Sequence, residues 1–153
     1  MKITDFLTPD RVIADLSGKE KTAVLDEMAR QLASSDLILE PAACLRVLQE
    51  REKISTTAIG EGVAIPHGKL PNVQRVSGLF ARSLEGVDFA SLDGEPTHLF
   101  FLLIAPQDAA ADHLKALARI SRLLKDPALR DRLMAAKTRQ EIYDIIATED
   151  QKF

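Results

Sequence analysis

Leu99-Phe100-Phe101-Leu102-Leu103-Ile104 is a continuous apolar run in which no polar residue interrupts the pattern. A strand with one wet face alternates apolar and polar residues, whereas a strand covered on both faces has no need to. The turn signal Asp93-Gly94 precedes the run. The stretch therefore predicts a strand from Thr97 to Ile104 inside a sheet that other elements cover on both sides.

Further strands are expected upstream of this run. Val76 to Ser83 has the composition of a strand, and Ser55 to Ile65 is rich in β-branched residues and glycine, which favours strand and loop. Between the N-terminus and these strands, Leu25, Met28, Ala29 and Leu32 recur at helical spacing. Ser17 to Glu20 resembles a capping box with Ser17 as N-cap, and Ser34-Ser35-Asp36 ends the pattern.

A second helix is expected before the strands, and three more helices are expected after Pro106. Pro41 suits the first turn of a helix that runs to about Arg51. The first of the later helices carries the stripe Leu114, Leu117, Ala118, Ser121 and Leu124, which we expect to face the core. A shorter helix follows from Pro127 to Ala136, and the last, after a capping box at Thr138 to Glu141, has Ile142, Ile145 and Ile146 inward. Helices and strands thus interleave along the whole chain. We expect one α/β domain over residues 1–153, with a central, mainly mixed sheet flanked by helices on both faces.

Composition narrows the class of protein. The chain has 153 residues, 46% of them hydrophobic and 28% charged, and a net charge of -3. The slightly acidic balance argues against a nucleic-acid partner, because phosphate backbones favour a basic surface. There is no signal-peptide pattern and no apolar run of membrane-spanning length. The single Cys44 cannot form an internal disulfide. We therefore expect a cytoplasmic protein.

One histidine stands out in the segment Gly60-Glu61-Gly62-Val63-Ala64-Ile65-Pro66-His67-Gly68-Lys69. Pro66 fixes its own backbone and biases Ile65 toward an extended conformation. Gly68 permits a sharp turn or the close approach of another molecule. The pattern predicts that His67 is presented at the end of a strand, on a stiff loop, which suits a nucleophile.

Two other residues could help to bind an anion beside His67. His113 lies at the start of the helix that follows the buried strand, where α/β proteins tend to place ligand groups. Arg51 ends the second helix, and its guanidinium offers paired donors to a phosphoryl or carboxylate group. The expected ligand of His67, His113 and Arg51 is thus a tetrahedral anion. The sequence has no Walker loop, dinucleotide fingerprint or paired-histidine zinc motif, so we expect neither metal nor cofactor.

Other candidates have simpler interpretations. His98 lies beside the buried strand without a suggestive loop, so we expect a structural role. Lys69 and Glu61 are expected to be surface charges. Cys44 falls on an apolar helix face and is expected to be a small core residue.

The segment Gly60 to Gly68 resembles the phosphorylation-site signature of IIA components of the phosphoenolpyruvate-dependent phosphotransferase system. The mannitol/fructose class and the nitrogen-related IIA protein share this signature. The resemblance extends to Glu50-Arg51-Glu52, to Asp112 through Leu117, and to the closing segment Arg139 to Ile146, so it covers almost the whole chain.

This resemblance implies roles for particular residues. His67 would accept a phosphoryl group from an HPr-like phosphocarrier, and His113 and Arg51 would support the transfer. Gly62, Gly68 and Thr57 are candidates for the loop around the phosphoryl group. The family often has asparagine where this chain has Glu61, and a carboxylate there would repel the phosphoryl group unless it points outward.

Three functions fit these observations. The first is a nitrogen-type regulatory IIA protein; it is favoured because the domain begins almost at Met1 with no membrane-spanning portion fused to it. Its partners would be the phosphocarrier and regulated proteins such as potassium transport or sensor kinase components. The second is a sugar-specific IIA component that passes phosphate to a fructose- or mannitol-type IIB domain. The third is a hydrolase that uses His67 and His113 as an acid–base pair.

Overall fold

The computed structural model describes residues 1–36 and 39–152. Its helices are α1 (Lys21–Ser35), α2 (Pro41–Ile54), α3 (Ala110–Leu124), α4 (Pro127–Ala135) and α5 (Arg139–Asp150), with short 3-10 helices η1 (Ile3–Asp5) and η2 (Pro9–Arg11). Its strands are β1 (Val12–Ile13), β2 (Ala58–Gly60), β3 (Val63–Ala64), β4 (His67–Leu70), β5 (Ser77–Val87) and β6 (Thr97–Pro106).

The strands form one mixed sheet in which β6 is central. The long strands β5 and β6 pair antiparallel, with Phe80 opposite Phe101. On the far side of β5 lies β1, parallel to it. On the other side of β6 lie first β3 and then β4, both parallel to β6, and β2 pairs antiparallel with β3. The interior position expected for the Leu99–Ile104 run is confirmed.

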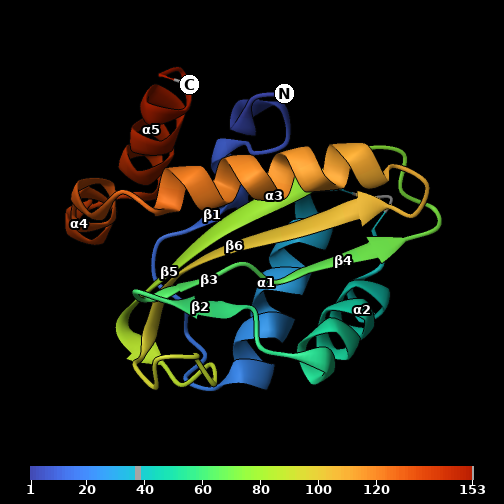
Figure 1. The fold of residues 1–153 in the computed structure, drawn as a ribbon, viewed down its shortest axis with the longest axis horizontal. Coiled ribbons are helices and arrows are strands. Elements are labelled where there is room, and N and C mark those ends of the chain that lie inside the picture. Colours follow the sequence, from blue (N-terminus) through green and yellow to red (C-terminus); the bar gives the residue numbers. More distant parts are fainter. Residues whose placement is uncertain (37–38, 153) are drawn as a thin grey trace.

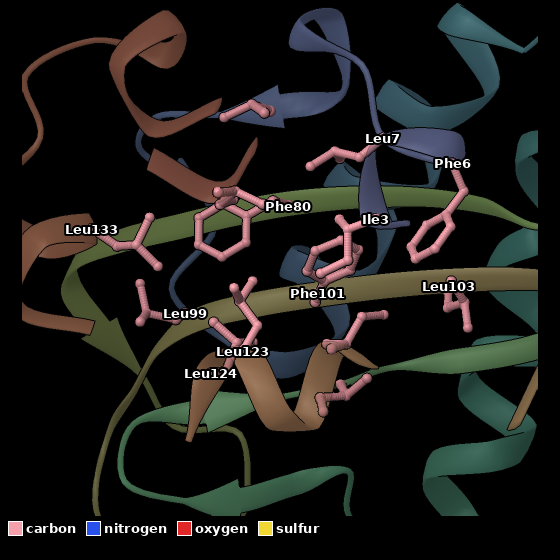
Figure 2. Packing of buried hydrophobic residues seen from close by; sticks show 14 of the residues in the cluster. Ile3, Phe6, Leu7, Phe80, Leu99, Phe101, Leu103, Leu123, Leu124 and Leu133 are labelled. Atoms are coloured by element: carbon pink, nitrogen blue, oxygen red, sulfur yellow. The ribbon is translucent and has the colours of Figure 1, made fainter. Parts of the chain in front are cut away.

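Helices cover the sheet on both faces (Figure 1). Helices α1 and α2 lie below the sheet in that view, and α3 lies above it with α4 and α5 toward one end. Successive residues of β6 face opposite layers: Phe101 and Leu103 join the cluster under α3, whereas Phe100, Leu102 and Ile104 join the cluster against α1 and α2. Figure 2 shows the first cluster, where Phe101 lies among Ile3, Phe80 and Leu123. The predicted fold class is therefore confirmed.

Two predicted helix starts differ in outcome. Helix α1 begins at Lys21 with Glu20 as N-cap, not at Ser17. The backbone N–H groups of Ser17 and Gly18 donate instead to the Glu27 carboxylate, at 3.0 and 2.9 Å, which holds this segment outside the helix. The helix start at Thr138 is confirmed, because its hydroxyl accepts the N–H of Glu141 at 3.1 Å. The Glu141 carboxylate accepts the N–H of Lys137, so the reciprocal half of the predicted capping box is formed one residue earlier.

The prediction of which face of α3 is buried was wrong, because the helix is rotated about its axis relative to the expected orientation. The residues that face the sheet are His113, Ala116, Ile120, Leu123 and Leu124, whereas Leu114 is exposed and Leu117 is only partly buried. Apolar spacing alone did not include a histidine in the buried set. Because His113 takes an inward position, the neighbouring leucine is turned toward solvent.

Arg82 is a buried cation that joins β5 to the end of α4. Arg82 is only 3% exposed. The guanidinium donates to the carbonyl oxygens of Ala14 at 2.8 Å, Leu133 at 2.8 Å and Ala136 at 2.7 Å. The last carbonyls of a helix lack partners within the helix. Arg82 therefore supplies donors, and a positive charge, where α4 presents its negative end.

Candidate functional site

His67 is the first residue of β4, so the expectation that it ends a strand was wrong. Strands β3 and β4 follow the same side of β6 and are separated only by Ile65 and Pro66. Proline has no N–H to donate, but its carbonyl still accepts the N–H of Leu103 at 2.9 Å. Pairing with β6 therefore resumes at once, with His67 opposite Leu103.

The register of β4 directs its side chains to the two layers in turn. His67 pairs with Leu103, which faces the α3 layer, and Gly68 pairs with Ile104, which faces α1 and α2. The imidazole of His67 consequently meets that of His113 on α3. The ring centroids are 5.4 Å apart and the ring planes make an angle of 80°. The structure thus brings together two histidines that lie far apart in the sequence.

A cleft of about 610 Å³ surrounds these histidines at the edge of the sheet. Helix α2 contributes Arg51 to its wall, β4 contributes His67 and Lys69, and α3 contributes His113. In Figure 1 the strand β4 lies between α3 and α2 at the edge of the sheet, so each helix forms one side of the cleft. Three of the predicted site residues, His67, His113 and Arg51, share this cleft with Gly68.

The hydrogen bond of His67 fixes its tautomer. Its Nδ1 lies 2.8 Å from the carbonyl oxygen of Ile65. A carbonyl can only accept, so Nδ1 carries the proton and donates. In the neutral ring, Nε2 therefore keeps its lone pair. The residue before the proline thus determines which nitrogen is available, which the sequence pattern could not reveal.

The surroundings favour the neutral form of His67. Burial is the largest cause that lowers its pKa, and the positive charges of Arg51 and Lys69 act in the same direction. The hydrogen bond to the Ile65 carbonyl and the charge of Glu52 act in the opposite direction and only partly offset this. The ring is therefore an unprotonated base, and so a competent nucleophile, near neutral pH.

His113 is buried, and its Nε2 has no hydrogen-bond partner among the described residues. Burial, followed by the charge of His67 when that ring is protonated and the charge of Lys69, lowers the pKa of His113 to about 4. A buried polar atom without a partner is costly and uncommon in folded proteins. His113 lines the cleft, so this unpartnered nitrogen lies next to the space that a ligand would occupy.

Acid should destabilise the fold through His113. Its pKa is lower in the folded protein than the ordinary value of 6.5, so the folded state resists taking up a proton that the unfolded chain binds. The stabilisation is complete above pH 6.5 and is lost as the pH falls toward 4. We expect a His113→Gln variant to show a smaller loss of unfolding free energy over this range than the wild type, by roughly 3 kcal/mol.

Urea unfolding at several pH values would test this expectation. Carboxylates titrate in the same range, so the informative quantity is the difference between wild type and variant. Equal pH dependence in both proteins would contradict the shifted pKa of His113.

Arg51 lies in the last turn of α2, which extends to Ile54 and not only to about Arg51. Its Nη1 donates to the carbonyl of Ser55 at 3.1 Å and so satisfies the end of the helix. Within residues 1–36 and 39–152, no further hydrogen bond involves its Nε or Nη2. Those N–H groups remain available to an anion in the cleft.

Two of the predicted loop residues do not reach this cleft. Gly62 lies next to His98, whose N–H donates to the Gly62 carbonyl at 2.9 Å, and this point is about five residues along β6 from the partner of His67. Thr57 is buried and bonds through both its hydroxyl and its N–H to the carboxylate of Glu52. Gly62 is therefore placed away from His67, whereas Thr57 lies behind the cleft wall, where its carbonyl accepts the N–H of Ile65 at 3.1 Å.

The remaining candidates agree with their simpler interpretations. Glu61 is exposed, has a φ of 58°, and lies 3.6 Å from Arg130, so it is not near the imidazole of His67. His98 bonds through Nδ1 to the Ser83 carbonyl at 2.9 Å. Cys44 is fully buried, and burial raises its pKa to about 11.

Two exposed apolar side chains at the edge of the cleft were not predicted from the sequence. Ile54 from α2 and Leu114 from α3 line the cleft and are 79% and 68% exposed. The sequence predicts Leu114 in the core and a helix end near Arg51, before Ile54. The position of His113 on the same helix is the signal that would turn Leu114 outward. Two exposed apolar side chains on either side of a histidine form a surface that can contact another protein.

The fold and the cleft, taken with a family match over most of the chain, define the class: a component of a phosphotransferase system. Residues 5–149 match the family model described as phosphoenolpyruvate-dependent sugar phosphotransferase system, EIIA 2. The chain belongs to this family, whose members are components of that phosphotransferase system.

The relatives of this chain include nitrogen regulatory proteins and sugar-specific components. The chain is 48% identical to a nitrogen regulatory protein of Bradyrhizobium diazoefficiens, over 96% of this chain and 95% of that protein. It is 40% identical, over 99% of its length, to 24% of a fructose-specific EIIABC component of Bacillus subtilis. The crystal structure of the nitrogen regulatory protein IIA-Ntr of Neisseria meningitidis superposes with a TM-score of 0.87 at 31% identity, covering 94% of this chain and 98% of that one.

In the described residues, no helix is both long and apolar enough to cross a membrane. The same residues hold no cluster of three or more histidine, cysteine or carboxylate side chains arranged to bind a metal ion.

Proposed function

We propose that this protein accepts a phosphoryl group on Nε2 of His67 from an HPr-like phosphocarrier. The observation that carries the proposal is the bond from Nδ1 of His67 to the Ile65 carbonyl, which leaves Nε2 as the nucleophile in a cleft that also holds His113 and Arg51. Membership of the EIIA 2 family supports it.

The step exchanges one phosphorus–nitrogen bond for another. The lone pair of Nε2 attacks phosphorus as the bond to the donor histidine breaks, and the donor ring recovers its electron pair. The proton on Nδ1 remains where it is. The phosphorylated ring carries positive charge, and the Ile65 carbonyl stabilises it by accepting the N–H hydrogen bond.

The phosphoryl oxygens need donors that are already in position. Arg51 offers N–H groups with no other partner in the described part of the chain. His113 supplies a second donor if Nε2 carries its proton, which the low pKa allows because the neutral ring has one N–H. Arg51 and His113 thus stabilise the phosphoryl group through charge and hydrogen bonds, and neither transfers a proton.

The exposed pair Ile54 and Leu114 would contact the carrier on either side of His67. Apolar contacts around the histidine would exclude water from the phosphoryl group during transfer. A phosphoryl group brings roughly two negative charges to this face. Binding of any partner to the same surface would therefore depend on whether His67 is phosphorylated.

We infer a nitrogen-type regulatory role in the cytoplasm, with output through phosphorylation-dependent binding to regulated proteins such as potassium transport or sensor kinase components. Similarity to nitrogen regulatory proteins over nearly their full length favours it. The similarity to the fructose-specific component favours a second candidate, a sugar-specific IIA component that passes phosphate to a IIB domain.

A reconstituted phosphotransfer assay tests the proposal. The protein is incubated with phosphoenolpyruvate, the first kinase of the system and each candidate HPr-like carrier, and mass spectrometry locates the product. We expect one acid-labile phosphoryl group on His67. Rapid onward transfer to a fructose- or mannitol-type IIB domain would favour the sugar-specific function. Turnover of a phosphodiester or ester without a carrier would instead favour the hydrolase.

Replacement of Arg51 by lysine is expected to slow phosphoryl transfer by about 10- to 100-fold. Lysine keeps the charge but loses the planar pair of donors. Rapid-quench kinetics with the phosphorylated carrier would measure the effect. Arg46→Lys is a matched control, because Arg46 is an exposed arginine of the same helix outside the cleft. Equal rates for both variants would contradict the role of Arg51.

A further inference from the structure

Gly68 lies where strand β4 and helix α2 come closest. A Cβ atom added at Gly68 would lie 2.8 Å from Cγ2 of Val47 and 3.2 Å from its Cβ. Real Cβ atoms essentially never approach another heavy atom within 3.0 Å. Gly68 has an ordinary extended conformation within β4, so of its two expected roles, a sharp turn or a close approach, the turn is not present. The glycine is needed for space, not for backbone freedom.

The contact has little room to relax. Val47 is β-branched and lies in the middle of α2, where such side chains have one strongly preferred rotamer. The main-chain carbonyl carbon of Val47 would lie 3.5 Å from the added atom. That distance is an ordinary van der Waals contact, but the Cβ of Val47, at 3.2 Å, is fixed to the main chain, so relief of the crowding requires α2 as well as the methyl group to give way.

The same helix carries Arg51. Val47 and Arg51 are four residues apart, hence neighbours on one face of α2, and both line the cleft with His67. The strand that presents His67 is thus the strand against which Arg51 is positioned. Any outward shift of α2 from Gly68 also moves the guanidinium away from the imidazole.

We propose that Gly68 is a positioning residue for phosphoryl transfer. Its missing side chain lets Val47 rest on β4, and this contact sets the separation between Arg51 and His67. The inference rests on the proposed function, because it concerns the stabilisation of a phosphoryl group on His67.

A double-mutant cycle tests the proposal. Gly68→Ala is expected to slow transfer from the phosphorylated carrier by about 10- to 100-fold, because a displacement near 1 Å can cost that much. Val47→Ala alone is expected to slow transfer less than Gly68→Ala does, because it loosens the contact without forcing α2 away from β4. The double variant loses the 2.8 Å contact with Cγ2 and keeps only the 3.2 Å contact with Cβ, so we expect the rate to recover most of the loss, to within about 5-fold of wild type.

A second measurement separates positioning from general destabilisation. The charge of Arg51 contributes to lowering the pKa of His67. NMR titration of Gly68→Ala should therefore give a higher pKa for His67, and the double variant should reverse the change.

Gly86→Ala is the matched control. Gly86 has a φ of +91°, and an added Cβ would lie 2.9 Å from Cε1 of His98, at the other end of β6 from the partner of His67. This variant should lose stability while keeping both the pKa of His67 and the transfer rate of its folded fraction.

Three outcomes would overturn the proposal: a wild-type rate in Gly68→Ala, no rescue in the double variant, or an equal slowing in Gly86→Ala. If Gly68→Ala fails to fold, Val47→Phe enlarges the same contact from the helix side, and an unchanged rate there would count against the inference. Failure of the proposed function has a different signature, since the wild type itself would then receive no phosphoryl group.

Discussion

Replacement of His67 by glutamine is expected to lower phosphoryl transfer from the carrier by at least about 10⁴-fold, because the variant has no nucleophilic nitrogen. The glutamine amide can still donate to the Ile65 carbonyl that His67 bonds at 2.8 Å. The fold should therefore persist, with an unfolding free energy within about 1 kcal/mol of wild type. Intact-protein mass spectrometry and urea unfolding measure the two quantities.

His98→Gln provides the control for this result. His98 is also bonded through Nδ1 to a backbone carbonyl, that of Ser83, but lies outside the cleft. It should keep full labelling. Stoichiometric labelling of the His67 variant, or loss of labelling in the His98 variant, would contradict the assignment of His67 as the acceptor.

Arg82→Met is expected to lower the unfolding free energy by about 3–5 kcal/mol. The methionine fills much of the space but donates no hydrogen bond. The carbonyls of Ala14, Leu133 and Ala136 would lose the donor that each now has at 2.7–2.8 Å. Two of them belong to the end of α4, so that helix should also exchange its amide hydrogens faster.

Arg46→Met is the matched control for Arg82, since it removes an exposed guanidinium from another helix. Its effect should stay within about 0.5 kcal/mol. Urea unfolding of the two variants at neutral pH makes the comparison. Similar small losses in both would show that the bonds to the end of α4 contribute little to stability.

The layered architecture could be predicted because local signals agreed with one another. The run through Phe100, Phe101 and Leu102 has no polar side, and only a strand covered on both faces accommodates it. Pro41 and Thr138 marked helix starts through their backbone and side-chain chemistry. The short strands β1 and β4 were not predicted, because two to four residues carry too little pattern to identify a strand.

The site could be predicted only in part. Local chemistry singled out His67, His113 and Arg51 and the family resemblance gave them roles, but no spacing in the chain places their side chains in one cleft. Their proximity results from the position of β4 beside β6, which brings a strand edge between α2 and α3. Gly62 belongs to the same glycine-rich segment but lies beside His98, because the extended chain carries it away from His67.

The tautomer and the tight helix contact depend on three-dimensional distances that no sequence pattern encodes. The Ile65 carbonyl is two residues from His67, yet its approach to Nδ1 depends on the backbone at Pro66. Likewise, Val47 and Gly68 meet only after α2 packs on β4. Sequence reasoning identified the residues, and the packing determined what each can do.

The most direct test of the central claim is an NMR measurement on nitrogen-15-labelled protein phosphorylated through the carrier. Coupling between phosphorus and the ring nitrogens identifies the nitrogen that holds the phosphoryl group. We predict a single phosphohistidine at His67, with phosphorus on Nε2 and the proton retained on Nδ1 beside the Ile65 carbonyl. Phosphorus on Nδ1, or on any other residue, would contradict the account.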